Sequence, residues 1–157
     1  MKKLALLLLP ALMFAFTSCS DDDDLPQVSI DTTYTGATMV DGTLYVVQDQ
    51  EFAITSVVAT PLRDGKKAGI TAVDYLLDGW NIGYTAVSPF AITFDAGTFT
   101  LGKHLLSMSM IIAEEGCSLA TGYYATDMVV VATADEIPTP DADTEQGVLR
   151  ITPTIQQ

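Results

Sequence analysis

The sequence predicts an all-β protein built as an antiparallel β-sandwich, and three observations lead to this fold class. Runs rich in Val, Ile, Thr, Tyr and Phe are separated by Gly, Asp and Pro along most of the chain. Several runs alternate apolar and polar residues with a period of two, as a sheet covered on one side requires. No run keeps an apolar period of 3.6 residues, which a helix would need.

The Gly, Asp and Pro residues between the runs mark the ends of the expected strands. They lie at residues 28–34, 43–48, 52–60, 71–78, 82–87, 90–95, 104–113 and 125–133. In the seventh run the expected inward side carries Leu106, Met108, Met110 and Ile112. In the sixth run it carries Phe90, Ile92 and Phe94. Asp78-Gly79 predicts a two-residue hairpin turn, because both residues tolerate a positive φ.

The N-terminus has the pattern of a secretory signal. Lys2 and Lys3 precede an apolar run at residues 4–16, and small residues follow it. This run is shorter than the roughly 20 residues that a membrane span needs. It ends in Phe16-Thr17-Ser18-Cys19, which resembles the lipobox of bacterial lipoproteins. The resemblance implies removal of residues 1–18 and acylation of Cys19; the alternative is an ordinary signal followed by an incidental cysteine.

An acidic run directly follows the cysteine, within a predicted tether at residues 19–26. Its members are Ser20, Asp21, Asp22, Asp23 and Asp24. The run resembles the export signal of Bacteroidota surface lipoproteins, and this resemblance implies a lipid anchor in the outer membrane with the domain facing outside. Four adjacent carboxylates also repel each other and stay hydrated, so the alternative is a solvated linker without a routing role.

Three stretches in the middle of the chain resemble bacterial immunoglobulin-like domains, in the order that this family has them. Residues 73–83 are similar to a hairpin of two neighbouring strands, residues 88–95 to the strand that follows, and residues 102–106 to the opening of the long F strand. The resemblance implies an immunoglobulin-like sandwich over residues 27–134 and carries no catalytic residues. A long connection over residues 114–124 is expected before the last strand.

Residues 135–157 form an acidic segment that contains proline, which is typical of a surface tail. Residues 147–152 have the composition of a final edge strand, and whether the tail joins the sheet is left open by the sequence. The net charge is −13, with 7 Lys and Arg against 20 Asp and Glu, and no basic patch offsets it. Nucleic acid is therefore excluded as a partner.

The residues usually found in catalytic and metal sites are sparse. His104 is the single histidine, and we expect it to serve the structure at the start of a strand. Cys117 has acidic neighbours, which disfavour a reactive thiolate, so we expect an inert thiol in a turn. The cluster Asp141, Asp143 and Glu145 lacks the spacing of a calcium loop and is interpreted as a solvated tail. No cofactor, metal or catalytic residue is predicted.

Aromatic residues give the one site hypothesis. Trp80 directly follows the predicted Asp78-Gly79 turn, Tyr84 lies just beyond it, and Tyr123 and Tyr124 fall on the expected long connection. Exposed aromatics dominate binding hot spots, so these four residues are predicted to bind a glycan or protein ligand. The alternative is that Trp80 folds back over the end of the sandwich as a lid.

The leading functional expectation is therefore a lipid-anchored, non-catalytic binding or adhesion module. An alternative is a structural subunit or spacer of a cell-envelope assembly that pairs through an open strand edge. A third hypothesis, a small hydrolase, would need a carboxylate pair that no spacing singles out. The ligand and the oligomeric state are not specified by the sequence.

Overall fold

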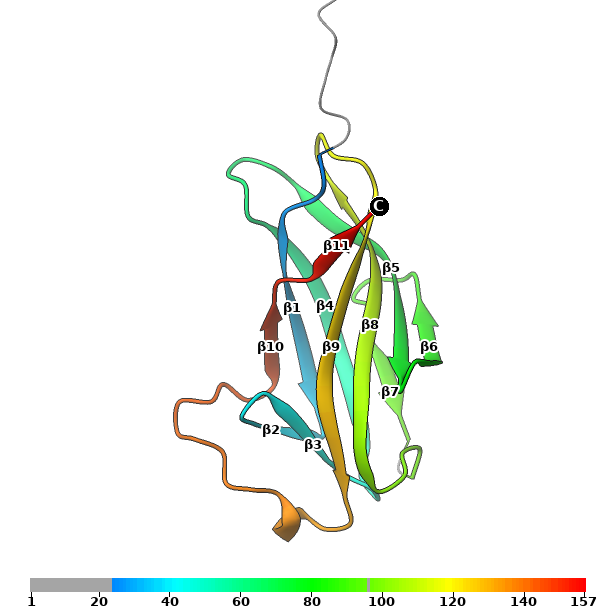
Figure 1. Ribbon diagram of the computed structural model, residues 1–157, viewed down its shortest axis with the longest axis vertical. Helices are drawn as coiled ribbons and strands as arrows, with labels where there is room; N and C mark the ends of the chain where they lie inside the picture. Colours follow the sequence, from blue (N-terminus) through cyan, green and yellow to red (C-terminus); the bar gives the residue numbers. More distant parts are fainter. Residues whose placement is uncertain (1–23, 96) are drawn as a thin grey trace, which may run out of the picture.

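The computed structural model describes residues 24–95 and 97–157, which form a two-sheet β-sandwich (Figure 1). Acylation is expected at Cys19 and the export signal at Ser20 and Asp21 to Asp24. Of these residues, Asp24 belongs to the described part of the chain and the others lie outside it. Within the described part, no helix is long and apolar enough to cross a bilayer. The helix that it does contain is the 3-10 turn η1 (Ala134–Glu136).

The two sheets differ in size. The smaller sheet has the order β10 (Val148–Ile151), β1 (Val28–Thr35), β4 (Phe52–Pro61) and β7 (Ile92–Phe94), with every pair antiparallel. The larger has the order β2 (Ala37–Val40), β3 (Thr43–Val47), β9 (Ala120–Val131), β8 (Gly102–Glu114), β5 (Ala68–Leu77) and β6 (Trp80–Thr85), and β11 (Thr154–Gln156) pairs with β9.

This strand order makes the fold immunoglobulin-like, as the sequence predicted. Strands β1, β4 and β7 take the places of A, B and E in one sheet, and β5, β8 and β9 take those of C, F and G in the other. Strand β3 pairs in parallel with β9, from Leu44 opposite Met128 to Val47 opposite Val131. The remaining pairs in the larger sheet are antiparallel.

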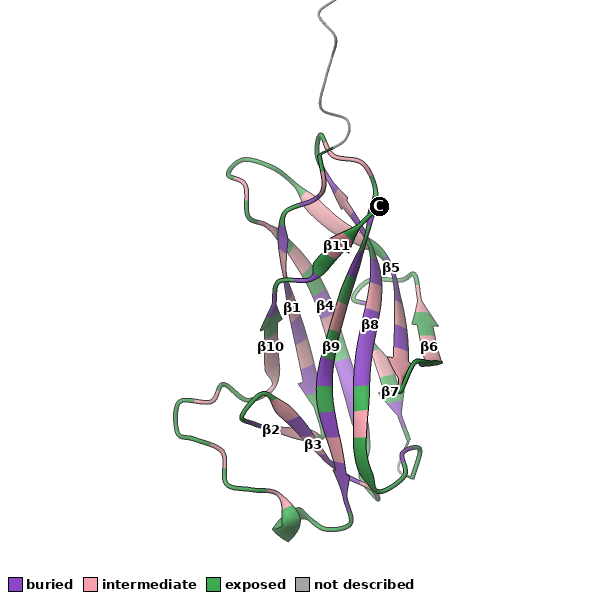
Figure 2. Cartoon of the chain, viewed as in Figure 1, coloured by how far each residue is buried: buried purple, intermediate pink, exposed green. Residues whose placement is uncertain are grey.

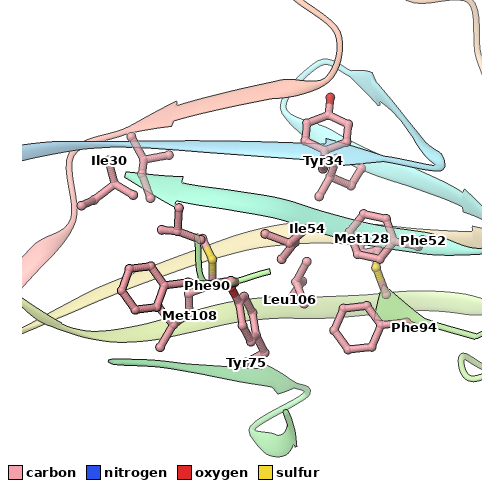
Figure 3. Packing of buried hydrophobic residues seen from close by; sticks show 14 of the residues in the cluster. Ile30, Tyr34, Phe52, Ile54, Tyr75, Phe90, Phe94, Leu106, Met108 and Met128 are labelled. Atoms are coloured by element: carbon pink, nitrogen blue, oxygen red, sulfur yellow. The ribbon is translucent and has the colours of Figure 1, made fainter. Parts of the chain in front are cut away.

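The core lies between the inner faces of the two sheets (Figures 2 and 3). Phe52 and Phe94 stack with ring centroids 5.7 Å apart, and Phe99 lies 5.3 Å from Phe94. Tyr75 is fully buried, and its hydroxyl donates a hydrogen bond to the Phe90 carbonyl. A buried hydroxyl with a partner avoids the cost of desolvating a polar group without one.

The alternation in the seventh run predicted the inward side of β8 correctly. Leu106, Met108, Met110 and Ile112 are all buried. The turn prediction is also confirmed, because Asp78 and Gly79 have φ values of 51° and 83° and join β5 to β6. These two positive values suit a type I′ turn, whose twist matches that of the flanking strands.

The last long strand begins earlier than predicted. The sequence placed residues 114–124 in a connection, but β9 starts at Ala120 and pairs with β8 from Ala120 opposite Ile112. Gly122 lies within this strand. The absence of a side chain there is required inside the sandwich, since a Cβ would lie 2.4 Å from Ile112 Cδ1.

Two further predictions differ from the structure. The strand expected at residues 90–95 is limited to β7, because Phe90 has a φ of 63° and its backbone N–H donates to the Val87 carbonyl in a turn. The strand β2 was not predicted. It forms a hairpin with β3 around Asp41 and Gly42, whose φ values of 47° and 78° again suit a type I′ turn.

The C-terminal segment is part of the sandwich. After η1 the chain returns so that β10 lies at the edge of the smaller sheet, with Ile151 opposite Ile30. Strand β11 then crosses to the larger sheet, with Ile155 opposite Gly122. Figure 1 shows the C-terminus at the same end of the molecule as the point where residue 24 enters the fold. The tail from 135 onward thus completes both sheets.

Candidate functional site

The turn between β5 and β6 presents the single tryptophan to solvent. Trp80 is 79% exposed, the largest exposed fraction among the large hydrophobic side chains of the described residues. It lies opposite Leu77 in the hairpin register. Trp80 therefore does not fold back as a lid over the sandwich.

Hydrogen bonds to β8 hold this turn in place. The Asp78 carboxylate accepts from the Leu105 backbone N–H at 2.8 Å and lies 2.7 Å from His104 Nδ1. The other ring nitrogen of His104 lies 2.8 Å from the Thr100 carbonyl. Because both nitrogens face acceptors, the site favours the doubly protonated imidazolium. The turn that carries Trp80 is thus preorganised by an ion pair.

The pKa values of this pair move in opposite directions. The hydrogen bond to Asp78 raises the pKa of His104 above its ordinary value, although partial burial opposes this shift. The hydrogen bond from His104 lowers the pKa of Asp78. His104 was expected to serve the structure at a strand start, and its contacts are indeed with the turn and with the loop before β8.

Tyr84 and Tyr123 lie on the outer face of the larger sheet, and the strand register brings them into one row. Tyr84 on β6 is opposite Asp74 on β5, Asp74 is opposite Ser109 on β8, and Ser109 is opposite Tyr123 on β9. Residues directly opposite each other point to the same side of a sheet. Tyr84 is 62% exposed and Tyr123 is 43% exposed. In Figure 1, β8 and β9 lie in front of β1 and β4, so the view is onto this face.

The four predicted aromatic residues do not form one cluster. Tyr124 follows Tyr123 directly in a strand and so points inward, where it packs against the core. Its burial raises the pKa of its hydroxyl. Trp80 is opposite Leu77, whose other neighbour Leu106 is buried, so Trp80 lies on the side of β6 away from Tyr84. The prediction that Tyr123 and Tyr124 lie on a loop is wrong, because the strand β9 contains both.

A second group of polar residues lies where residue 24 enters the fold. The Glu114 side chain is fully buried, and its carboxylate accepts from Arg63 Nε at 3.1 Å and from Arg63 Nη2 at 2.8 Å. The Gln27 backbone N–H also donates to it at 2.7 Å, and Arg63 contacts the Leu25 carbonyl at 3.2 Å. The hydrogen bonds from Arg63 lower the pKa of Glu114. Arg63 and Glu114 thus fasten the first described residues to the sandwich.

Cys117 adjoins this group. Its Sγ lies 2.6 Å from Arg63 Nη2 and 3.7 Å from the Glu114 carboxylate, and its backbone N–H donates to the Glu114 carbonyl in a turn. The turn was predicted, but the guanidinium beside the thiol was not. Among residues 24–95 and 97–157, no group of three His, Cys, Asp or Glu side chains is placed to hold a metal ion.

The sequence alone did not predict several residues of these two groups. Asp74 and Ser109 were interpreted as the solvent side of a sheet, and nothing in the sequence linked them to the tyrosines. For Glu114 a signal existed, because it continues the inward parity of Met110 and Ile112. A carboxylate on the buried side of a strand requires a partner, but the sequence did not identify Arg63 as that partner.

Comparisons with known proteins give no family membership. No family model matches the chain, and no curated protein matches it. Among solved structures, it is similar to the fibronectin(III)-like modules of Clostridium thermocellum CbhA, at 16% sequence identity and a TM-score of 0.43. That match covers 69% of this chain and 51% of the other, so the chain spans about half the length of its match. The fold class therefore rests on the strand order described above.

Proposed function

We propose that this protein is a non-catalytic binding module, anchored by lipid in the outer membrane and displayed outside the cell. The single observation that carries the binding role is Trp80, which is 79% exposed on a turn held by Asp78 and His104. An exposed aromatic on a rigid turn loses little conformational entropy when it contacts a ligand. The anchor is supported by the sequence pattern around Cys19, and the outward orientation by Asp21 to Asp24.

Fluorescence tests the binding role, because Trp80 is the single tryptophan and the emission reports this turn alone. The full-length acylated protein in detergent micelles is titrated with a panel of host and dietary oligosaccharides and host surface proteins. We expect the red-shifted emission of an exposed indole, which a ligand then quenches or shifts to the blue. The control variant Val58→Ala alters an exposed side chain on the opposite sheet and leaves the response unchanged. An emission that no ligand in the panel changes would contradict the proposal.

Two variants test the anchor and the display. Cys19→Ser removes the acylated atom, so palmitate labelling should be lost and the protein should leave the membrane fraction. Replacement of Asp21, Asp22, Asp23 and Asp24 by Asn should preserve labelling but protect the domain from protease added to intact cells of a Bacteroidota host. Equal protease sensitivity of the Asn variant and the natural protein would reduce the acidic run to a hydrated linker.

A structural role in an envelope assembly is the second candidate, and one observation favours it. Strand β6 is an edge of the larger sheet, and between Trp80 and Thr85 it contains none of the Lys or Pro residues that often protect such edges. A partner that adds a strand there would use the main chain of β6. Co-purification of that partner should survive Trp80→Ala, whereas ligand binding through Trp80 should not.

A further inference from the structure

We propose that the outer face of β6, β5, β8 and β9 binds an uncharged glycan chain that lies across the strands between Tyr84 and Tyr123. This inference rests on the proposed function and names a second site and a ligand class for it. The site is independent of Trp80, which lies on the other side of β6.

The strand register fixes the length of this face. Tyr84, Asp74, Ser109 and Tyr123 lie directly opposite one another on four adjacent strands. Three interstrand steps of about 4.8 Å separate the two tyrosines, so they are about 14 Å apart. The row runs at right angles to the strands. An extended chain of several sugar rings can contact both aromatic side chains along such a line.

The floor between the tyrosines is small and polar. Asn81 Nδ2 donates to the Asp74 carboxylate at 2.8 Å, which fixes both side chains on the outer face. Ser109 is half-buried, and Ser107, in the neighbouring row opposite Leu76, is buried and contributes no exposed group. Asp74 accepts hydrogen bonds, Asn81 both donates and accepts, and the Ser109 hydroxyl does either. This set matches the hydroxyl groups of a sugar.

The combination of aromatic ends and a polar floor selects the ligand class. The apolar C–H side of a sugar ring can lie on the face of a tyrosine, while its hydroxyls reach the polar floor. A protein partner would instead need an apolar, uncharged centre, because interface cores are depleted of charged residues. The two central members of this row are Asp74 and Ser109, and the Asp74 carboxylate has no counterpart of opposite charge in the row.

The charge of this face further restricts the class of glycan that it can bind. Among the described residues of these four strands, the face carries the carboxylates of Asp74 and Asp127 against the one cation Lys103, so its charge is negative, and the whole chain has a net charge of −13. An acidic glycan is repelled by these carboxylates, and so is a second copy of the same face. An uncharged glycan meets neither penalty.

Affinity electrophoresis of the full-length protein tests this site. Native gels contain either an uncharged polysaccharide (galactomannan, arabinoxylan, mixed-linkage β-glucan or glycogen) or an acidic one (polygalacturonate or hyaluronate). We expect at least one uncharged polysaccharide to retard the protein, and neither acidic one to do so. Tyr84→Ala and Tyr123→Ala should each weaken binding about tenfold. Val58→Ala, on the opposite sheet, should bind as the natural protein does, and Tyr84→Phe should retain binding because the ring is kept.

Each other outcome overturns the inference in an identifiable way. If no uncharged polysaccharide retards the natural protein, or if the acidic ones retard it, the ligand class is wrong. If the double variant of Tyr84 and Tyr123 is retarded as strongly as the natural protein, with an unchanged thermal midpoint, the site is wrong. Loss of binding in Trp80→Ala alone would place the ligand at the turn, so the proposed function would stand without this face. If the tyrosine variants and Trp80→Ala all keep binding, both the site proposed on this face and the binding role proposed for Trp80 are refuted.

Discussion

The interior contact between Gly122 and Ile112 provides a quantitative test of the packing between β8 and β9. A Cβ at position 122 would lie 2.4 Å from Ile112 Cδ1 and 3.4 Å from Pro153 Cβ. Non-bonded carbon atoms are normally about 3.5–4.0 Å apart, so the methyl group overlaps Ile112 by more than 1 Å. Ile112 is fully buried and cannot move its terminal methyl into solvent. Gly122→Ala should therefore destabilise the protein by about 2 kcal/mol, as overpacked cores do.

A second substitution removes the overlapping atom. Ile112→Val deletes Cδ1 and alone should cost about 1 kcal/mol. In the double variant, the new Cβ of residue 122 occupies the space that Cδ1 leaves, so the protein should come within about 0.5 kcal/mol of the original stability. The two substitutions together then cost roughly 2.5 kcal/mol less than the sum of the single ones.

Urea unfolding followed by far-ultraviolet circular dichroism measures this cycle, and an unchanged m-value confirms that the unfolding transition stays comparable. Gly69→Ala is the matched control, because a Cβ at that position of β5 would meet no atom within 4 Å. It should change stability by no more than about 1 kcal/mol. If the losses in the double variant simply add, or if Gly122→Ala alone is harmless, the close approach of β9 to Ile112 is refuted.

Three further predictions concern polar groups. The folded state raises the pKa of His104, so the stability that its ion pair adds is fully present below the unfolded pKa of about 6.5. This stability is lost as the pH rises through the higher folded pKa. The thermal midpoints measured at pH 5.5 and 8.5 should therefore differ less in His104→Asn than in the natural protein. Arg63→Met should expose the segment around Leu25 to limited proteolysis, whereas Lys66→Met should not, and equal cleavage would refute the role of Arg63. Thr32 is buried and its hydroxyl has no hydrogen-bond partner among residues 24–95 and 97–157. Thr32→Val should therefore leave the stability in thermal unfolding unchanged or raise it by about 1 kcal/mol. A loss of stability would indicate that the Thr32 hydroxyl makes a hydrogen bond.

The strands that follow a period of two were predictable from the sequence. In β8 three large apolar residues, Leu106, Met108 and Met110, are separated by single serines, so the buried side could be assigned from parity. The Asp78-Gly79 turn was predictable for a local reason as well, since both residues need a positive φ. Local patterns thus gave the fold class and the position of Trp80.

The features that depend on distant contacts were not predictable. Gly122 fell within the connection that was expected over residues 114–124. Only the facing Ile112 shows why a side chain cannot be placed there. Tyr123 and Tyr124 were therefore expected on a connection and not on a strand. For this reason, the sequence did not show that their side chains point to opposite faces of the sheet. The row from Tyr84 to Tyr123 depends on the register of four strands, which no single segment encodes.

The position of β1 determines how the domain responds to force. Residue 24 leads into the first residue of β1, and β1 pairs with β4 from Val28 to Thr35 and with β10 from Ile30 to Thr33. Hydrogen bonds between strands are perpendicular to them, so tension applied at residue 24 along β1 loads both ladders in shear. Bonds loaded in shear must break together, whereas bonds at a peeled edge break one at a time. A ligand held on the larger sheet while residue 24 is fixed would therefore load β1 against both of its neighbouring strands at once.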